Sequence, residues 1–263
     1  VIKDKLGFKY TKTPKLLAWG GGNGNNIVII DWQTQELYSK AQVACQNIYT
    51  IPPLNLMFAL NSSNNTASLQ VLDISEKGII KKVGKQDVKA AKGAKFFAFN
   101  SKRNIFGALS QEGSAAYNLY TINNLASSSQ DIVKFSRQSK WPSQYTTKSN
   151  NAICDVDFNP EGTRAAMIDA FGCCLISDVN TDEYLCHFAI GDNELAKFTH
   201  ANYTQKCRWS SVHSKQNIFV KYDRFLNMID VEKQQLCWKN PVILDGSLFN
   251  SNNLNTSIEV CPV

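Results

Sequence analysis

The chain has 263 residues, of which 43% are hydrophobic and 19% are charged, and its formal net charge is +6. This composition excludes a disordered tail, and the length allows one large all-β domain or two smaller domains. No apolar run reaches the roughly eighteen residues that a membrane helix needs, and the first residues lack the apolar core of a signal peptide. We therefore expect a cytoplasmic or nuclear protein, although a signal cleaved before residue 1 would leave the same sequence.

The first distinctive stretch is GGGNGNNIVIIDW, residues 20–32. A phosphate-binding loop would need a third glycine at the start of a helix, because the phosphate sits on free N–H groups there. That glycine is missing, and the β-branched run that follows is typical of a strand. Since residues 16–19 are also strand-like, the sequence predicts a hairpin with a glycine and asparagine turn.

A loose repeat follows along the chain, in which a strand ends in aspartate and an apolar residue. Its copies are VIIDW ending at Trp32, LQVLDI at Ile74, CLISDV at Val179 and LNMIDV at Val231, with YNLYTI at Ile122 as a variant. The corresponding units span approximately residues 11–40, 45–85, 94–138, 151–190 and 204–243. The fourth unit divides into four short strands, 153–159, 164–170, 173–179 and 184–190, separated by turn residues. Four short antiparallel strands are the plan of one propeller blade.

Residues 155–185, DVDFNPEGTRAAMIDAFGCCLISDVNTDEYL, resemble the blade pattern of the WD-repeat β-propellers. In that family an F-S-P-D-G turn precedes a glycine and a strand that ends in Trp-Asp. The resemblance is best in the fourth and fifth units, and the chain is similar to a divergent member. It implies an all-β propeller of four-stranded antiparallel blades, with about five blades present.

The family also implies a hydrogen-bond network within each blade. In the fifth unit His200 stands nine residues before Trp209, and Asp223 stands six residues before the position of the family's tryptophan. That position is occupied by Ile229, and the fourth unit has Phe171 in place of the turn aspartate. The resemblance therefore implies a partial structural network made of His200, Asp223 and Trp209.

The number of blades leaves two alternatives open. Residues 257–263, SIEVCPV, read as the first strand of a sixth unit, and residues 5–10 as the outer strand of a preceding blade. One alternative is a five-bladed ring closed by its own termini. The other is a segment of a larger propeller with seven or eight blades, in which strand edges pair with further blades of the same chain or with a strand-donating partner.

Eight cysteines are spread through apolar, strand-like segments, which favours buried free thiols over disulfides. They are Cys45, Cys154, Cys173, Cys174, Cys186, Cys207, Cys237 and Cys261. The Cys173-Cys174 pair does not predict a zinc site, because neighbours in a strand point to opposite faces and no C-x-x-C spacing occurs. We expect no metal and no cofactor.

Titratable residues do not form a catalytic motif. Besides His200, the histidines are His187 in a predicted outer strand and His213 in a turn. Asp155 and Asp157 share one face of a strand, and such a pair is typical of a solvated edge or a turn. We therefore predict a protein that is not an enzyme.

Lysines gather after the second repeat, in a stretch with few acids. They are Lys77, Lys81, Lys82, Lys85, Lys89, Lys92 and Lys95. We expect these lysines, together with Tyr222 and Arg224, to form the interaction surface. The resemblance implies a scaffold for protein–protein interaction within a larger assembly; the alternative is a propeller subunit that binds RNA or another acidic partner through the lysines, with salt-sensitive affinity.

Overall fold

The fold was analysed in a computed structural model, and every regular element it describes is a β-strand. The described residues are 6–8, 15–20, 26–31, 34, 36–43, 47–51, 56–63, 66–74, 80–89, 97–100, 102–109, 116–123, 132–142, 153–189, 205–210, 216–222, 225–239 and 242–243. Within these residues there is no helix that is long and apolar enough to cross a membrane.

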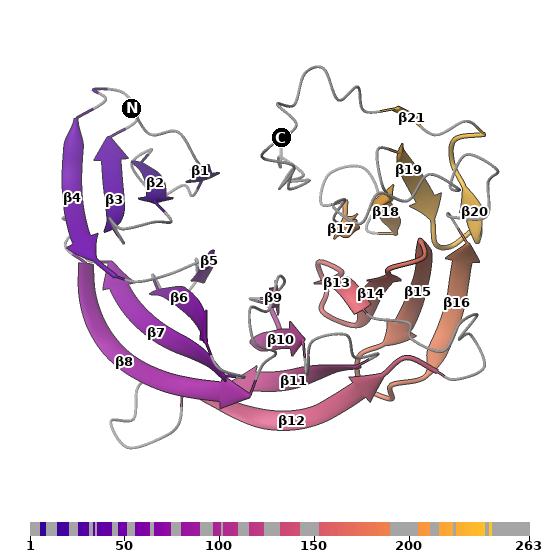
Figure 1. The fold of residues 1–263 in the computed structure, drawn as a ribbon, viewed down its shortest axis with the longest axis horizontal. Coiled ribbons are helices and arrows are strands. Elements are labelled where there is room, and N and C mark those ends of the chain that lie inside the picture. The colour runs from indigo at the N-terminus through magenta and orange to yellow at the C-terminus, as the bar shows by residue number, and fades with distance from the viewer. Residues whose placement is uncertain are drawn as a thin grey trace. The chain divides into compact units, whose positions relative to one another are not determined.

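The strands form five antiparallel sheets, numbered here in chain order (Figure 1). Sheet 1 contains β1 (Leu6–Phe8), β2 (Lys15–Gly20), β3 (Asn26–Asp31) and β4 (Leu37–Gln42). Sheet 2 contains β5 (Asn47–Ile51), β6 (Leu56–Ser63), β7 (Thr66–Ile74) and β8 (Ile80–Lys89). Sheet 3 contains β9 (Phe97–Asn100), β10 (Ile105–Leu109), β11 (Ala116–Ile122) and β12 (Val133–Lys140).

The last two sheets follow the same plan. Sheet 4 contains β13 (Ile153–Phe158), β14 (Arg164–Asp169), β15 (Cys173–Asp178) and β16 (Tyr184–Ala189). Sheet 5 contains β17 (Lys206–Trp209), β18 (Asn217–Tyr222), β19 (Phe225–Asp230) and β20 (Gln235–Leu236), and β21 (Val242–Ile243) also pairs with β19. Apart from β21, consecutive strands are neighbours in every sheet, as the four-strand repeat predicted.

The glycine-rich stretch joins two paired strands, β2 and β3, whose register places Gly20 opposite Asn26. This confirms the predicted hairpin, because a strand follows where a phosphate loop would need a helix. The expectation for residues 5–10 was wrong. Leu6–Phe8 pairs with β2 and is the first strand of sheet 1, not the outer strand of a preceding blade.

The recurring aspartates lie at or near the ends of the third strands, and two of them cap the turn that follows. Asp178 Oδ1 accepts the N–H groups of Asn180 and Thr181, at 2.7 and 3.0 Å. Asp230 Oδ1 accepts the N–H of Lys233 at 3.0 Å. A short carboxylate at this position supplies an acceptor for turn N–H groups that have no strand partner. The turn chemistry thus explains why this residue type recurs.

A one-residue bulge in the fourth strand accompanies the motif in three sheets. The pairing shifts between Ile29 and Ile30 in β3, between Val71 and Leu72 in β7, and between Ile176 and Ser177 in β15. The extra residues on the partner strands are Tyr38, Val83 and Leu185. Bulges raise the local twist, so the outer strands bend at equivalent points of the repeat.

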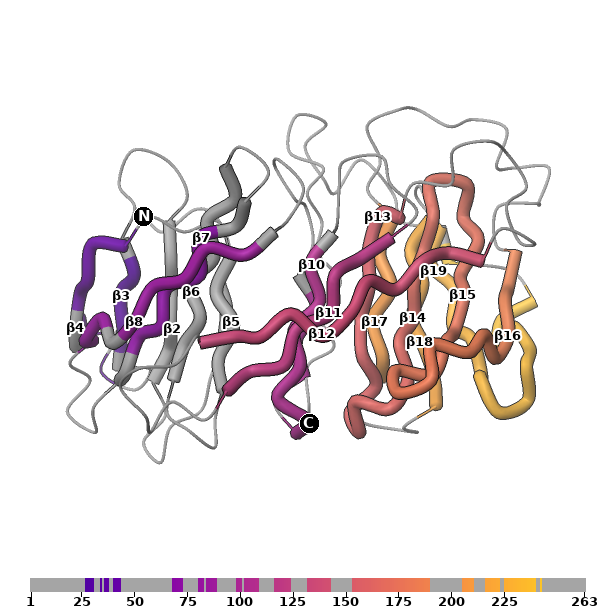
Figure 2. The backbone as a smooth tube through the Cα atoms, turned by 90° about the horizontal axis from the view of Figure 1, so that it is seen from below, coloured from indigo at the N-terminus to yellow at the C-terminus, as the bar shows by residue number. Residues whose placement is uncertain are grey.

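Contacts divide the chain into two compact units, Val1–Gly93 with Ile122–Lys134, and Ala94–Thr121 with Phe135–Val263. In the second unit the first strands of three successive sheets, β9, β13 and β17, lie next to one another (Figure 1). The tube view in Figure 2 shows β13 to β19 as closely stacked strands. Sheets 4 and 5 share one apolar core, which includes Ile168, Ile176, Trp209, Val220 and Ile229.

Gly172, in the turn between β14 and β15, fixes how closely sheet 5 approaches sheet 4. Its φ is +81°, and a Cβ at this position would lie 2.7 Å from the ring of Tyr222. Asp169 Oδ1 closes the turn by accepting the N–H groups of Phe171 and Cys173, at 2.9 and 2.7 Å. Only glycine meets both the backbone and the packing requirement without strain.

We expect Gly172→Ala to lower the free energy of unfolding by about 1–3 kcal/mol, because it combines a strained φ with a clash against Tyr222. Thermal or urea unfolding measures the loss. Gly172→Asn is the matched variant, since asparagine tolerates a positive φ but still carries a Cβ, and it should be intermediate. An unchanged midpoint for Gly172→Ala would contradict the close packing of Tyr222 on this turn.

Candidate interaction surface

Four of the predicted lysines belong to β8, the outermost strand of sheet 2, and the side chains of three of them are described. Lys81, Lys82 and Lys85 of β8 are exposed, and the only exposed acid among the described side chains of β8 is Asp87. We call these three lysines the basic edge. Lys89 belongs to the same strand, but its side chain is outside the described part. Lys77, Lys92 and Lys95 lie outside the described residues altogether.

The opposite side of β8 packs against the start of β12, within the first unit. A Cβ on Gly84 would lie 3.0 Å from Ile132 Cδ1, so glycine permits a close approach here. Two residues further on, the Gln86 amide donates to the Val133 carbonyl and accepts the Val133 N–H, both at 2.8 Å. These contacts anchor one side of the strand and leave the basic edge facing solvent.

Tyr222 does not belong to the interaction surface that the sequence predicted. Its side chain is only 3% exposed, because the ring lies over the Gly172 turn. Arg224, the other predicted member, falls outside the described residues. So do His200 and Asp223, and their network with Trp209 stays a prediction.

Trp209 and its neighbours are held by two carboxylates from the first strand of the preceding sheet. Asp155 is completely buried, and its Oδ2 accepts from Arg208 Nη1 at 2.6 Å and from the Cys207 N–H at 3.2 Å. Lys206 Nζ lies 3.6 Å from the other carboxylate oxygen. Two cations and a backbone donor therefore compensate one buried charge.

Asp157 repeats this contact two residues further along β13. Its Oδ2 accepts the Trp209 N–H at 2.8 Å, and its carbonyl accepts from Trp209 Nε1 at 3.2 Å. Burial raises the pKa of Asp157 to about 6, against the opposing influence of Arg208 and the Trp209 N–H. The expectation of a solvated edge was therefore wrong, because β17 covers this strand: Asp155 is completely buried and Asp157 is half-buried.

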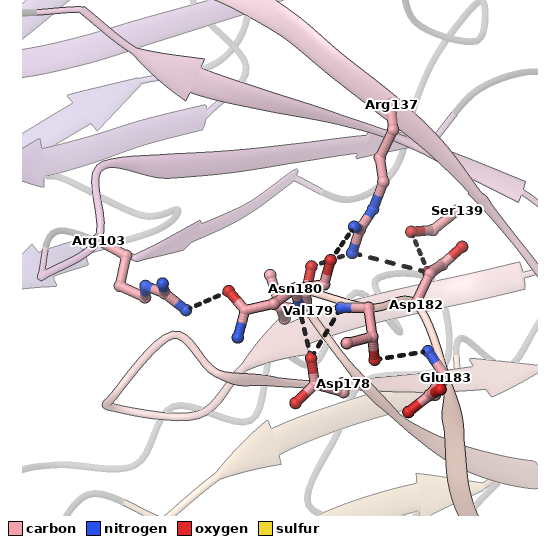
Figure 3. Close-up of polar contacts among 9 residues, drawn as sticks. Arg103, Arg137, Ser139, Asp178, Val179, Asn180, Asp182 and Glu183 are labelled. Carbon is pink, nitrogen blue, oxygen red and sulfur yellow. Dashed lines mark hydrogen bonds and ion pairs between the residues drawn. The ribbon is translucent and has the colours of Figure 1, made fainter.

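Sheets 3 and 4 are joined by arginines that hold the turn between β15 and β16 (Figure 3). Arg103 Nη1 donates to Asn180 Oδ1 at 2.7 Å, and Arg137 Nη1 donates to the Asn180 carbonyl at 2.6 Å. Arg137 also donates to the Val179 carbonyl. Ser139 Oγ donates to Asp182 Oδ1 at 2.6 Å, which fixes a residue with a positive φ of 64°.

The thiols mostly serve packing. Cys173, Cys174, Cys186 and Cys207 are buried and free, as predicted, whereas Cys154 is half-buried. Cys237 is exposed, contrary to expectation, because it follows the two-residue strand β20 at the periphery of sheet 5. In the described part of the chain, no group of three or more His, Cys, Asp or Glu residues is placed to hold a metal ion.

An exposed aromatic side chain on β12 was not among the residues predicted from the sequence. Phe135 is 54% exposed, and its ring meets Tyr120 edge-on at a centroid distance of 5.7 Å. Lys134 and Lys140 are exposed on the same strand. The stretch VKFSRQSK has three cations and no acid, and this local signal would have identified a second basic segment.

We expect the free energy of unfolding to decrease as the pH rises from about 4 to about 6. The folded state binds a proton at Asp157 more tightly than the unfolded chain does. The pKa rises from 3.8 to about 6 on folding, so the native state holds more protons in this window and loses stability as the pH rises. Asp157→Asn keeps an oxygen acceptor for Trp209 and should remove this decline.

Urea midpoints across this pH range test the assignment, with Asp87→Asn on the exposed side of β8 as the control. Profiles that run parallel for wild type and Asp157→Asn would show that Asp157 does not titrate in this window.

No family model matches the chain, and no curated protein matches it. Solved structures do. A chain in the crystal structure of the mitotic checkpoint complex matches with a TM-score of 0.61 and 9% identity, over 92% of this chain and 66% of that chain. Hsv2 of Kluyvelomyces marxianus matches with a TM-score of 0.50 and 10% identity, over 87% of this chain and 83% of that chain.

This chain thus spans just under two thirds of the length of the checkpoint-complex chain, at 66%. Both neighbours are WD-repeat propellers. Together with the repeated four-stranded antiparallel sheets, this likeness shows a β-propeller fold.

Proposed function

We propose that this protein is a non-catalytic scaffold that binds protein partners on the outer strands of its blades, in the cytoplasm or nucleus. The fold supports this proposal, since the matching chain with a TM-score of 0.61 comes from a multi-protein complex. Because fold similarity alone does not assign a function, the proposal depends on the residues exposed at the surface.

The basic edge is the observation on which the proposed function depends. Lys81, Lys82 and Lys85 are exposed on one ten-residue strand, and Gly84 and Gln86 hold that strand in place from the other side. Charges on a rigid strand keep their spacing, which favours complementary recognition over a diffuse attraction. The partner surface is therefore acidic.

The interior polar groups support the same conclusion. Asp155 and Asp157 are engaged by Arg208, Cys207 and Trp209, and burial raises the pKa of Cys207 well above its usual range. A thiol with a raised pKa is a poor nucleophile at neutral pH. These groups serve the contact between sheets 4 and 5, and recognition is assigned to the outer strands.

In the triple variant Lys81→Glu, Lys82→Glu and Lys85→Glu, we expect the amount of retained partner protein to fall by about tenfold or more. The reason is that the reversed charges repel an acidic surface. The measurement is quantitative mass spectrometry of proteins retained by the immobilised protein, with lysine crosslinks to locate the contact. Retention by wild type should also fall as salt screens the attraction.

Reversal of three exposed lysines elsewhere, Lys102, Lys233 and Lys239, is the matched control for total charge. Equal loss in both variants would contradict a role for the basic edge. If nuclease treatment abolished retention, the partner would be a nucleic acid and the protein-scaffold proposal would be overturned.

A further inference from the structure

Strand β8 is the last strand of sheet 2, and its main chain is paired on one side, by β7 (Figure 1). Strand β4 of the same compact unit approaches β8 but does not pair with it. Among the described backbone groups, no hydrogen bond joins the main chain of β8 to the main chain of any strand except β7. In an antiparallel pair every second residue directs its N–H and carbonyl away from the neighbour, so β8 presents an open edge.

This edge is regular beyond the bulge at Val83, because the pairing with β7 runs without a further shift from Gly84 to Lys89. Gln86 holds this part of the strand from one face. Its amide exchanges two hydrogen bonds, both of 2.8 Å, with the main chain of Val133 in the same compact unit. A strand that is already fixed in place loses little further conformational entropy when another strand pairs with it.

The exposed charges of β8 change sign along the strand. Lys81, Lys82 and Lys85 come first, and Asp87 follows two residues after the last of them. Lys85 and Asp87 lie on the face opposite Gln86, since side chains alternate along a strand. A complementary strand therefore carries acidic residues opposite the lysines and a basic residue opposite the aspartate.

The charge balance favours an acidic partner over a second copy of this chain. The described exposed side chains of β8 are three lysines and one aspartate, so the strand has an excess of positive charge. Two copies of β8 would bring like net charges together, and such repulsion is how edge lysines oppose self-association. A mainly acidic strand meets no such repulsion.

We propose that β8 binds an extended, mainly acidic segment of a protein partner, which adds to sheet 2 as an antiparallel strand. Its main chain pairs with the open edge from Gly84 to Lys89, a basic residue near its start meets Asp87, and acidic residues further along meet the lysines of the basic edge. The antiparallel direction follows the pairing within sheet 2, and it is the more stable per residue. This inference rests on the proposed scaffold function and names the conformation, direction and charge order of the partner segment.

The probes are two fluorescein-labelled heptapeptides with blocked ends, measured by fluorescence anisotropy. The first reads Lys-Val-Glu-Val-Glu-Val-Glu from its N-terminus, and the second has the same residues in reverse order. Both carry the same net charge, so a diffuse attraction to the lysines would bind them equally. We expect the first to bind about fivefold more tightly, because only this order places glutamates opposite the lysines in an antiparallel strand.

A third peptide tests the main-chain pairing. It has the first sequence with every second amide N-methylated, so it keeps its charge order but cannot pair as a strand, and its affinity should fall about tenfold or more. This comparison requires no mutation, so it holds even if a variant destabilises the protein. The double variant Lys81→Glu, Lys85→Glu should weaken binding of the first peptide by a similar factor. Lys102→Glu, Lys239→Glu is the matched control for total charge and should retain it.

Equal affinity for the two peptide orders, undiminished binding of the N-methylated peptide, or no saturable binding of any peptide would overturn strand addition at β8. Binding of an oligouridylate in place of the peptides would overturn it in favour of RNA. A dimer in sedimentation velocity that Lys85→Glu dissociates would show that a second copy occupies the edge.

The two proposals fail in different ways. If the triple lysine variant loses the retained proteins while the two peptide orders bind equally, the basic edge binds an acidic surface without strand addition. The proposed function then stands and this inference fails. If the triple variant retains its partners, the proposed function fails whichever peptide binds.

Discussion

The unpaired edges of the first strands place the strongest constraint on this fold. β17 ends its sheet, and its Cys207 and Trp209 N–H groups point away from β18. A buried N–H without an acceptor costs about 1–3 kcal/mol, so the contact between sheets 4 and 5 forms only if acceptors are present. Asp155 and Asp157 of β13 supply them, and Arg208 offsets the charge that is buried with them. The apolar core of the two sheets therefore depends on these hydrogen bonds and on the ion pair of Arg208.

Side-chain hydrogen bonds also hold sheet 3 against sheet 4. Asn100 Nδ2 donates to the Asn159 carbonyl at 2.8 Å, and Arg103 and Arg137 bond to the Asn180 turn. These donors are attached to strands and turns of one sheet and reach carbonyls of the next. Side chains thus perform between sheets the pairing that backbone groups perform within each sheet.

The outer strands face a different constraint, since one of their edges meets solvent. Edge strands are commonly protected by lysine, and β8 and β12 both carry lysines. Among the described residues of β8 and β12, the exposed side chains are accordingly polar or charged, apart from Phe135.

Short-range sequence features determined which segments form strands and turns. Tertiary contacts determined which side chains are buried and what they contact. The sequence alone predicted the four-strand units, the hairpin at the glycines and the exposed lysines of β8, because alternation and turn residues act over a few positions. It did not place Tyr222 on the Gly172 turn or Asp155 and Asp157 against β17, since each contact joins residues about fifty positions apart. Burial of a side chain depends on which sheet covers it, and only the packed structure decides that.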